Sequence, residues 1–231
     1  MVPTIIHQTA PGDEALWHPI WTTCQNSWRA AYPEYTYMFW DDDDLDHLVR
    51  EHFPEYLELY TLYPKNIYRI DFCRYLILYR HGGIYADMDY YCSRRFTHRL
   101  SSDKVSLVAS PAPNETLQNS LMASPAGHEF WIHVLDNAAA FFYVNQDIIL
   151  DPTARQHRRG QIVISATGPR LLDRVHASRP EQVHVLPVSE FNPRTSVGLP
   201  APPYTRHYYT GKWGCRDHPT NRPITIDEPL P

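Results

Sequence analysis

A helix, a pair of glycines, a short strand and two aspartates follow one another without interruption between residues 66 and 89. Apolar residues recur at helical spacing over residues 66–80, so this segment is predicted to form a helix. Residues 81–83, His-Gly-Gly, end it, because glycine tolerates the left-handed conformation that a helix C-terminus favours. Residues 84–86, Ile-Tyr-Ala, then form a short strand that delivers Asp87 and Asp89 at its end. The pattern places two acidic groups at the edge of a sheet.

Strands and helices alternate along the rest of the chain, which predicts an α/β fold. The expected strands cover residues 2–7, 36–40, 84–86, 105–110, 162–166 and 183–186. The expected helices cover residues 16–31, 45–50, 66–80, 129–144 and 167–175, with a further helical piece between Pro54 and Pro64. Asp41 to Asp44 are predicted to cap the helix at residues 45–50. From Phe191 onward the chain is rich in proline and aromatic residues and is expected to be irregular.

Composition excludes several classes of protein. A chain of 231 residues that is 43% apolar and 20% charged can bury a hydrophobic core. The formal net charge of -5 argues against a general nucleic-acid-binding protein, whose surface is normally basic. No run approaches the ~20 apolar residues of a transmembrane segment, and no signal-peptide pattern is visible, so neither is expected. Four separated cysteines without a CxxC pair argue against a zinc ribbon and indicate reduced thiols.

Asp87 and Asp89 alternate at the predicted strand end, so their side chains lie outside the carboxyl edge of the sheet. Two carboxylates held together repel each other unless a cation lies between them. Hard oxygen ligands select Mg²⁺ or Mn²⁺, ions whose coordination is usually completed by substrate phosphates. The alternative is a turn that carries two solvated aspartates.

The residues around this motif resemble the signature of DXD-containing sugar transferases. The resemblance is carried by residues 68–75, Tyr-Arg-Ile-Asp-Phe-Cys-Arg-Tyr, and by residues 81–89, His-Gly-Gly-Ile-Tyr-Ala-Asp-Met-Asp. The most similar group contains initiating mannosyltransferases and inositol phosphorylceramide mannosyltransferases, and glucosylating bacterial toxins share its core. Weaker similarities lie at residues 2–9, 32–41, 167–169 and 207–213.

The resemblance implies a GT-A type, Rossmann-like fold that binds a nucleotide-sugar at the edge of a mixed central sheet. It implies one domain over residues 1–231, in which the irregular segment 191–231 closes the active site. The implied reaction transfers a hexose from GDP-mannose or a UDP-hexose to a hydroxyl of a glycan or lipid acceptor. Mn²⁺ or Mg²⁺ is the implied cofactor, and the anomeric configuration is retained. Members in the eukaryotic Golgi carry a membrane anchor, whereas no such segment is expected here. We therefore expect this chain to be cytoplasmic, in the host cytoplasm if its gene is viral.

The resemblance also assigns roles to individual residues near the motif. Asp89 is expected to bind the metal directly, and Asp87 to contact both the metal and the ribose of the donor. Asp71 and Arg74 lie one helical turn apart and match a pair that grips the hydroxyls of the donor sugar. The alternative for this pair is an ion pair on the helix surface, worth about 0.3 kcal/mol. Asn119 matches an asparagine near the transferred sugar, or is an ordinary helix or turn residue. Asp71, Arg74, Asp87 and Asn119 are therefore the expected catalytic residues.

Three further positions are expected to contact the donor. Gln8 and Thr9 end the first strand, where the family places the nucleobase, although they could equally cap a turn. Tyr85 is expected either to bind the donor or to belong to the core. Residues 167–169, Thr-Gly-Pro, resemble a loop beside the donor or acceptor, or simply start a helix.

Residues 207–213, His-Tyr-Tyr-Thr-Gly-Lys-Trp, resemble a C-terminal segment of retaining transferases, but lack a proline before the tryptophan. His207 is expected to complete the metal site, since a neutral imidazole can coordinate such an ion. Lys212 is expected to neutralise the departing diphosphate, and Trp213 to contact the donor.

The motifs assign no carboxylate to the role of covalent nucleophile, so attack on the same face, assisted by the leaving phosphate, is the working hypothesis. One rival is a phosphatase or phosphotransferase with an Asp-x-Asp nucleophile. Such motifs normally continue with threonine or valine, whereas Tyr90 follows here. The other rival is a catalytically inactive module that binds a nucleotide-sugar, which would not need the metal carboxylates.

Overall fold

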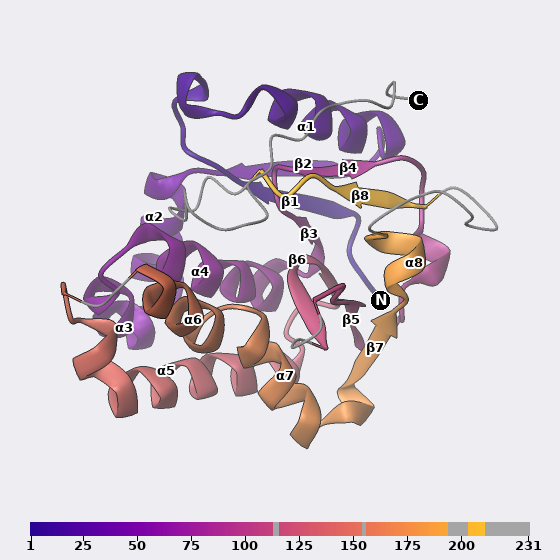
Figure 1. The fold of residues 1–231 in the computed structure, drawn as a ribbon. Helices are drawn as coiled ribbons and strands as arrows, with labels where there is room; N and C mark the ends of the chain where they lie inside the picture. The colour runs from indigo at the N-terminus through magenta and orange to yellow at the C-terminus, as the bar shows by residue number, and fades with distance from the viewer. Residues whose placement is uncertain (113–115, 154–155, 194–202, 211–231) are drawn as a thin grey trace.

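The computed structural model describes residues 1–112, 116–153, 156–193 and 203–210. A six-stranded sheet runs through it in the order β2-β1-β3-β6-β5-β7 (Figure 1). Its strands are β1 (Ile5–Thr9), β2 (Thr36–Trp40), β3 (Gly83–Ala86), β5 (Val105–Ala109), β6 (Leu117–Ser124) and β7 (Val183–Leu186). β1 is parallel to β2 and β3, β5 is parallel to β7, and β6 is antiparallel to both β3 and β5. The predicted α/β class with a mixed central sheet is confirmed.

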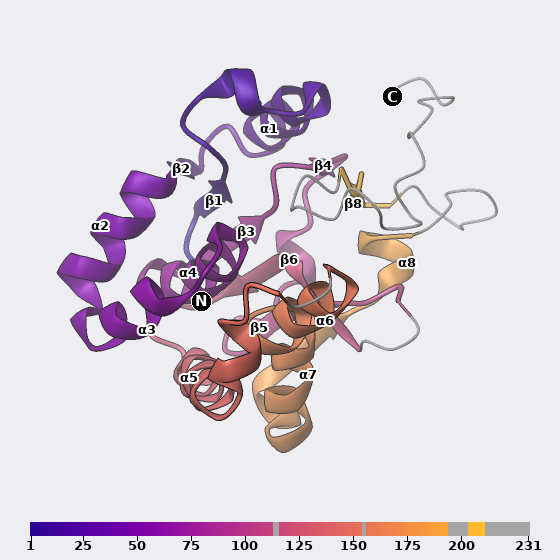
Figure 2. The same cartoon turned by 60° about the vertical axis from the view of Figure 1, so that its left-hand side comes forward.

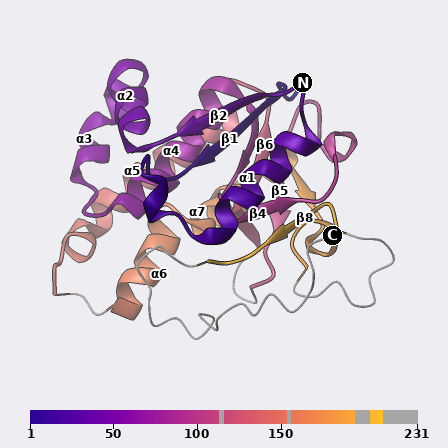
Figure 3. The same ribbon diagram turned by 90° about the horizontal axis from the view of Figure 1, so that it is seen from above.

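Helices pack on both sides of this sheet (Figures 1 and 2). One side carries α2 (Asp42–His52), α3 (Leu57–Leu62), α4 (Asn66–His81), α5 (Glu129–Ile149), α6 (Gln156–Ala166) and α7 (Pro169–Ser178). On the other side, α1 (Pro19–Ala31) packs against a two-stranded sheet of β4 (Tyr90–Cys92) and β8 (Thr205–His207) (Figure 3). The short helix α8 (Val188–Phe191) packs beside β5 and β8.

The core divides into separate buried clusters because the sheet lies between the helical layers. The largest cluster includes Tyr75 of α4 and Trp131 of α5, whose rings stack with centroids 5.6 Å apart. On the opposite side, Trp28 of α1 and Tyr32, which caps its C-terminus, pack around Phe96. α4 contacts both α5 and the sheet, so this helix is a fixed platform for the residues at its N-terminal half.

Local chemistry explains where the predicted elements begin and end. Asp41 caps α2 by accepting from the backbone N–H of Asp44, whose carboxylate accepts from the N–H of Asp41 in return. α4 ends at His81, and Gly82 follows with φ of 62° and ψ of -158°. The positive φ that glycine was predicted to allow is present, although the ψ is not that of the left-handed helix. The first strand lies at residues 5–9 rather than 2–7.

The predicted strand at residues 162–166 is wrong, because these residues form the C-terminal part of α6. Their β-branched side chains favour a strand locally, but Ile162 and Val163 pack against the large core cluster from a helix. The carbonyl of Val163 accepts from the N–H groups of Thr167 and Gly168, which ends α6 and leads into α7. Tertiary packing therefore overrides the local preference.

Three strands were not predicted from the sequence. β4 and β8 have three residues each and, within the described residues, pair with each other across about half of the chain. β6 is buried along its whole length, and it places Asn119 in a strand rather than in the helix or turn considered as an alternative. Among the residues that the structure describes, no helix combines the length and the apolar character needed to cross a bilayer.

Candidate active site

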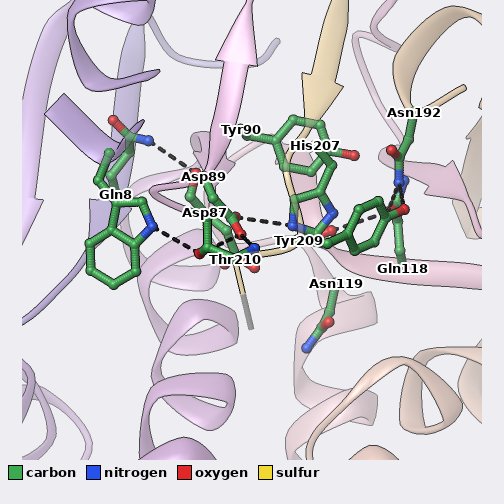
Figure 4. A network of polar contacts seen from close by, with 12 residues as sticks. Gln8, Asp87, Asp89, Tyr90, Gln118, Asn119, Asn192, His207, Tyr209 and Thr210 are labelled. Atoms are coloured by element: carbon green, nitrogen blue, oxygen red, sulfur yellow. Dashed lines mark hydrogen bonds and ion pairs between the residues drawn. The ribbon is translucent and has the colours of Figure 1, made fainter. Parts of the chain in front are cut away.

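The carboxyl ends of β1 and β3 meet at one edge of the sheet because the two strands are parallel neighbours. Asp87 directly follows β3, and its backbone N–H donates to the carbonyl of Ser120 on β6 at 2.8 Å. The N–H of Tyr90, at the start of β4, donates back to the carbonyl of Asp87 at 3.0 Å. This turn holds Asp87 and Asp89 at the edge where the sequence predicts them (Figure 4).

Asp71 and Arg74 are buried on α4 and form an ion pair of 2.8 Å. The guanidinium of Arg74 also lies 3.2 Å from Oδ1 of Asp87 and donates to the carbonyl of Asn119 at 2.8 Å. The amide of Asn119 donates to Asp71 at 3.2 Å. The ion pair considered as an alternative does form, but it is buried and not on the helix surface. The four residues predicted to be catalytic lie together, and their roles stay predictions.

Burial changes the ionisation of these acids. It raises the pKa of Asp71 to about 7, although the guanidinium of Arg74 opposes the shift. Burial also raises the pKa of Asp87, where Arg74 opposes the shift and the charge of Asp89 adds to it. The site thus concentrates negative charge that one arginine only partly compensates.

Both carboxylate oxygens of Asp89 have polar partners. Nε2 of His207 lies 3.0 Å from Oδ1, while Oδ2 accepts from the backbone N–H and the hydroxyl of Thr210 at 2.8 and 3.1 Å. Burial opposes the ionisation of Asp89, but His207 and the hydrogen bonds from Thr210 outweigh it and lower the pKa of Asp89 to about 2. Asp89 is therefore the more acidic carboxylate of the pair.

The residues present fit a divalent cation. Asp87, Asp89 and His207 each offer a ligand atom, and these atoms lie within 4.8 Å of one another. Carboxylate oxygens suit Mg²⁺ and Mn²⁺, and a neutral imidazole is a common metal ligand. Nδ1 of His207 is buried and makes no hydrogen bond within the described part of the chain. The predicted three-residue metal set is therefore assembled in the fold.

Gln8 and Thr9 connect the end of β1 to this motif. Nε2 of Gln8 donates to the carbonyl of Asp87 at 3.1 Å, and its Oε1 accepts from the hydroxyl of Tyr37 at 2.7 Å. The hydroxyl of Thr9 bonds that of Tyr85 at 2.9 Å, and Tyr85 also donates to Asp87 Oδ1 at 2.9 Å. The side chains of Gln8 and Thr9 thus bond residues of other segments, and Tyr85 is a core residue whose hydroxyl reaches the site. Their contact with a nucleobase or donor stays a prediction.

Residues 167–169, which resemble a loop beside the donor or acceptor in sugar transferases, also lie next to the site. The hydroxyl of Tyr75 donates to the carbonyl of Thr167 at 2.6 Å and accepts weakly from Asn119 at 3.4 Å. Pro169 begins α7 with Gly168 as its N-cap residue, so this loop also starts a helix as its alternative interpretation states. Both interpretations of these residues are compatible.

The C-terminal segment reaches the site through β8, in which His207 is the pairing partner of Tyr90. The N–H of Tyr208 donates to the carbonyl of Asp89 at 3.0 Å. Lys212 and Trp213, predicted to contact the donor, lie outside the described residues. Thr210 was not predicted, although it lies within the resembling segment.

Trp21 of α1 was also not predicted, and its indole N–H donates to the hydroxyl of Thr210 at 3.0 Å. A tryptophan in an amphipathic helix is normally interpreted as a core residue, and no signal in the sequence distinguishes Trp21 from such a residue. Cys24, Cys73 and Cys92 are buried free thiols, and Cys215 lies outside the described residues.

Comparison with known proteins places these residues in a family context. Residues 19–107 match the family model described as the glycosyltransferase sugar-binding region containing a DXD motif. Inositol phosphoceramide mannosyltransferase 3 of Schizosaccharomyces pombe is 34% identical over 142 residues, which are 62% of this chain and 38% of that protein. The chain thus spans well under half the length of this relative. The resemblance to DXD sugar transferases is confirmed.

Solved structures show the same fold at low identity. The PaToxG glycosyltransferase superposes with a TM-score of 0.58 at 15% identity, covering 78% of this chain and 70% of that chain. The UDP-bound glycosyltransferase domain of the YGT toxin superposes with a TM-score of 0.52 at 10% identity, covering 80% and 79%. The predicted GT-A type fold is confirmed.

Proposed function

We propose that this chain, whose residues 19–107 match the DXD sugar-binding family model, is a metal-dependent retaining glycosyltransferase. It transfers a hexose from a nucleotide-sugar, GDP-mannose or a UDP-hexose, to a hydroxyl of a glycan or glycolipid acceptor. The name of the relative from Schizosaccharomyces pombe supports mannose and a glycolipid, and the UDP-bound toxin domain supports a nucleoside diphosphate as the leaving group. A cytoplasmic location and a single domain over residues 1–231 belong to the same proposal.

One observation carries this proposal. The cluster of Asp87, Asp89 and His207 lies at the sheet edge, and the buried pair of Asp71 and Arg74 reaches the same Asp87. Ligands bind outside the carboxyl ends of the strands in open α/β sheets. A cation-binding set next to a carboxylate and a guanidinium is suited to a diphosphate joined to a sugar with several hydroxyls.

Asp87, Asp89 and His207 would hold the metal, with Mn²⁺ favoured over Mg²⁺ because one of the three ligands is a nitrogen. Bound there, the ion would stabilise the negative charge that grows on the departing diphosphate. Arg74 holds Asp71 and Asp87 in fixed positions by ion pairs, and Asn119 donates to Asp71. Asp71 and Asn119 then orient the hydroxyls of the donor sugar by hydrogen bonds. Such preorganised polar groups are usually the largest contribution to catalysis.

Retention follows in this proposal from attack on the face that the diphosphate leaves. The acceptor oxygen forms its bond to the anomeric carbon as the bond to the phosphate oxygen breaks, and the hydroxyl proton moves to that phosphate oxygen. The carboxylate of Asp71 is already engaged by Arg74 and Asn119, which makes it a poor covalent nucleophile. Isolation of a trapped glycosyl-enzyme adduct would contradict this mechanism.

The experiment that tests the function measures hydrolysis of the donor. The protein is incubated with a panel of UDP- and GDP-sugars, with and without Mn²⁺, and free nucleoside diphosphate is detected. We expect one donor to be turned over with Mn²⁺ only, and the rate to fall at least about 100-fold in Asp89→Asn. Asp103→Asn, an exposed aspartate remote from the motif in sequence, is the control.

Absence of both turnover and metal-dependent binding for every donor would reject the proposal in favour of an inactive module or a phosphatase. Release of phosphate from simple phosphate esters without any acceptor would identify the phosphatase.

A further inference from the structure

Tyr209 is one of two exposed aromatic side chains in the described part of the chain. It is 47% exposed and Tyr143 on α5 is 48% exposed, whereas the other described aromatic side chains are buried or half-buried. Tyr143 lies in the last turns of α5, next to the buried Phe142. Tyr209 instead lies beside the carboxylate cluster, where its ring centroid is 4.0 Å from that of His207.

The conformation of Tyr209 is fixed although its side chain is exposed. Its φ of 47° lies in the left-handed region, which a bulky residue rarely adopts and which persists only when the surroundings hold it there. The amide of Asn192 makes two hydrogen bonds, one that holds Tyr209 and one that fixes Asn192 itself. One is donated to the hydroxyl of Tyr209 at 2.5 Å and the other to Oε1 of Gln118 at 2.8 Å. Asn192 and Gln118 are buried, so this support is rigid.

Tyr209 lies on one side of the metal cluster and Gln8 on the other. Gln8 is on β1 and Gln118 on β6, and these strands flank β3, which delivers Asp87 and Asp89. Figure 4 shows the same arrangement, with Gln8 at one side and Tyr209, Gln118 and Asn192 at the opposite side. If the donor nucleotide binds toward β1, the second substrate must approach from the side of β6. The positions of the donor and of the second substrate in this argument rest on the proposed function.

We propose that Tyr209, held by Asn192 and Gln118, is the platform of an acceptor subsite for a ring that carries several hydroxyls, such as a pyranose or a cyclitol. The face of an aromatic ring is negative, so the weakly positive C–H groups on one face of such a ring pack against it. A rigid aromatic side chain binds with little loss of conformational freedom. The left-handed backbone at Tyr209 places this ring against His207 and thus next to the reacting atoms.

Direct binding tests the subsite without any donor. Saturation-transfer NMR is recorded with methyl α-D-mannopyranoside and with myo-inositol on the wild type, Tyr209→Gly, Tyr209→Phe and Tyr143→Ala. Glycine adopts the left-handed conformation at position 209 without strain, so Tyr209→Gly removes the ring and keeps the turn. We expect the wild type, Tyr209→Phe and the matched control Tyr143→Ala to bind at least one probe, and Tyr209→Gly to bind it at least tenfold more weakly.

Kinetics separate this proposal from the proposed function. With a donor that the enzyme accepts, Tyr209→Gly should raise KM for the acceptor at least tenfold and KM for the donor less than threefold. A larger effect on the donor, equal binding by Tyr209→Gly and wild type, or no binding of either probe by the wild type would overturn the subsite. Probe binding with neither turnover nor metal-dependent binding of any donor would uphold the subsite and contradict the transferase. A thermal melt confirms folding, and Tyr209→Asn, which also tolerates the left-handed region, replaces glycine if needed.

Discussion

Arg74 on α4 and Asp87 at the end of β3 lie 3.2 Å apart inside the protein, and the same guanidinium holds Asp71 at 2.8 Å. One buried cation therefore serves two buried carboxylates from different elements. Cζ of Arg74 also lies over the ring of Tyr85, 4.9 Å from the centroid. This side chain thus links α4 directly to the residue that follows the motif strand.

Arg74→Ala should lower the free energy of unfolding by about 3–5 kcal/mol, because it leaves two buried carboxylates without their cation. Urea denaturation measures this change. Arg95→Ala is the control, since Arg95 pairs with Glu34 where both side chains are about half exposed, and such pairs contribute less than about 1 kcal/mol. Equal effects of the two substitutions would show that Arg74 does not compensate the buried acids.

His207→Gln should weaken Mn²⁺ binding at least about tenfold, because it removes the one nitrogen ligand of the cluster. Mg²⁺ binding should fall less, since Mg²⁺ prefers oxygen ligands. Electron paramagnetic resonance measures free Mn²⁺, and competition with Mg²⁺ gives the ratio. His184→Gln, which changes an exposed histidine on β7, is the control. Unchanged Mn²⁺ affinity in His207→Gln would remove His207 from the metal set.

The parts of the site that were predicted from the sequence are those that local rules determine. Helical periodicity, a glycine at the helix end and a short apolar strand predict α4, Gly82 and β3, and hence where Asp87 lies. The spacing of Asp71 and Arg74 predicts a shared helix face but not its burial, because burial depends on how α4 packs on the sheet.

The parts that were missed depend on contacts between distant segments. β8 has three residues and no partner near it in the sequence, so its pairing with β4 could not be predicted from periodicity. That pairing aligns His207 with Tyr90 and so brings Thr210 to Asp89. The resemblance predicted His207, whereas Thr210 and Trp21 have no distinguishing signal.

His7 should make the protein less stable as the pH falls from 6.5 to 4. The residue is buried, its Nε2 donates to the carbonyl of Gly82 at 2.8 Å, and its Nδ1 accepts from the indole of Trp40 at 3.2 Å. Burial lowers the pKa of His7 to about 4, so between these pH values the unfolded chain binds a proton that the native state does not. The loss is roughly 3 kcal/mol over this range.

The comparison of wild type with His7→Gln isolates this effect. Other groups contribute to the pH dependence, and the raised pKa of Asp71 acts with the opposite sign, because the native state then holds the extra proton. Urea midpoints of both proteins at pH 4, 5, 6 and 7 give the difference in stability between wild type and His7→Gln. That difference should narrow as the pH falls, and a difference independent of pH would mean that His7 titrates normally.

Gly82→Ala should destabilise the protein by roughly 3 kcal/mol, because two penalties combine. The residue has φ of 62°, and an added Cβ would lie 2.5 Å from the backbone nitrogen of Ala126 and 2.8 Å from the carbonyl oxygen of Ser124. Gly127→Ala is the matched control, since its φ is 69° but no atom lies within 4 Å of the added Cβ. The free energy of unfolding of Gly127→Ala should fall only by the conformational penalty, about 1–2 kcal/mol. Urea denaturation of both variants measures the difference, and an equal loss would show that the close approach of Gly82 to Ala126 and Ser124 does not constrain the entry into β3.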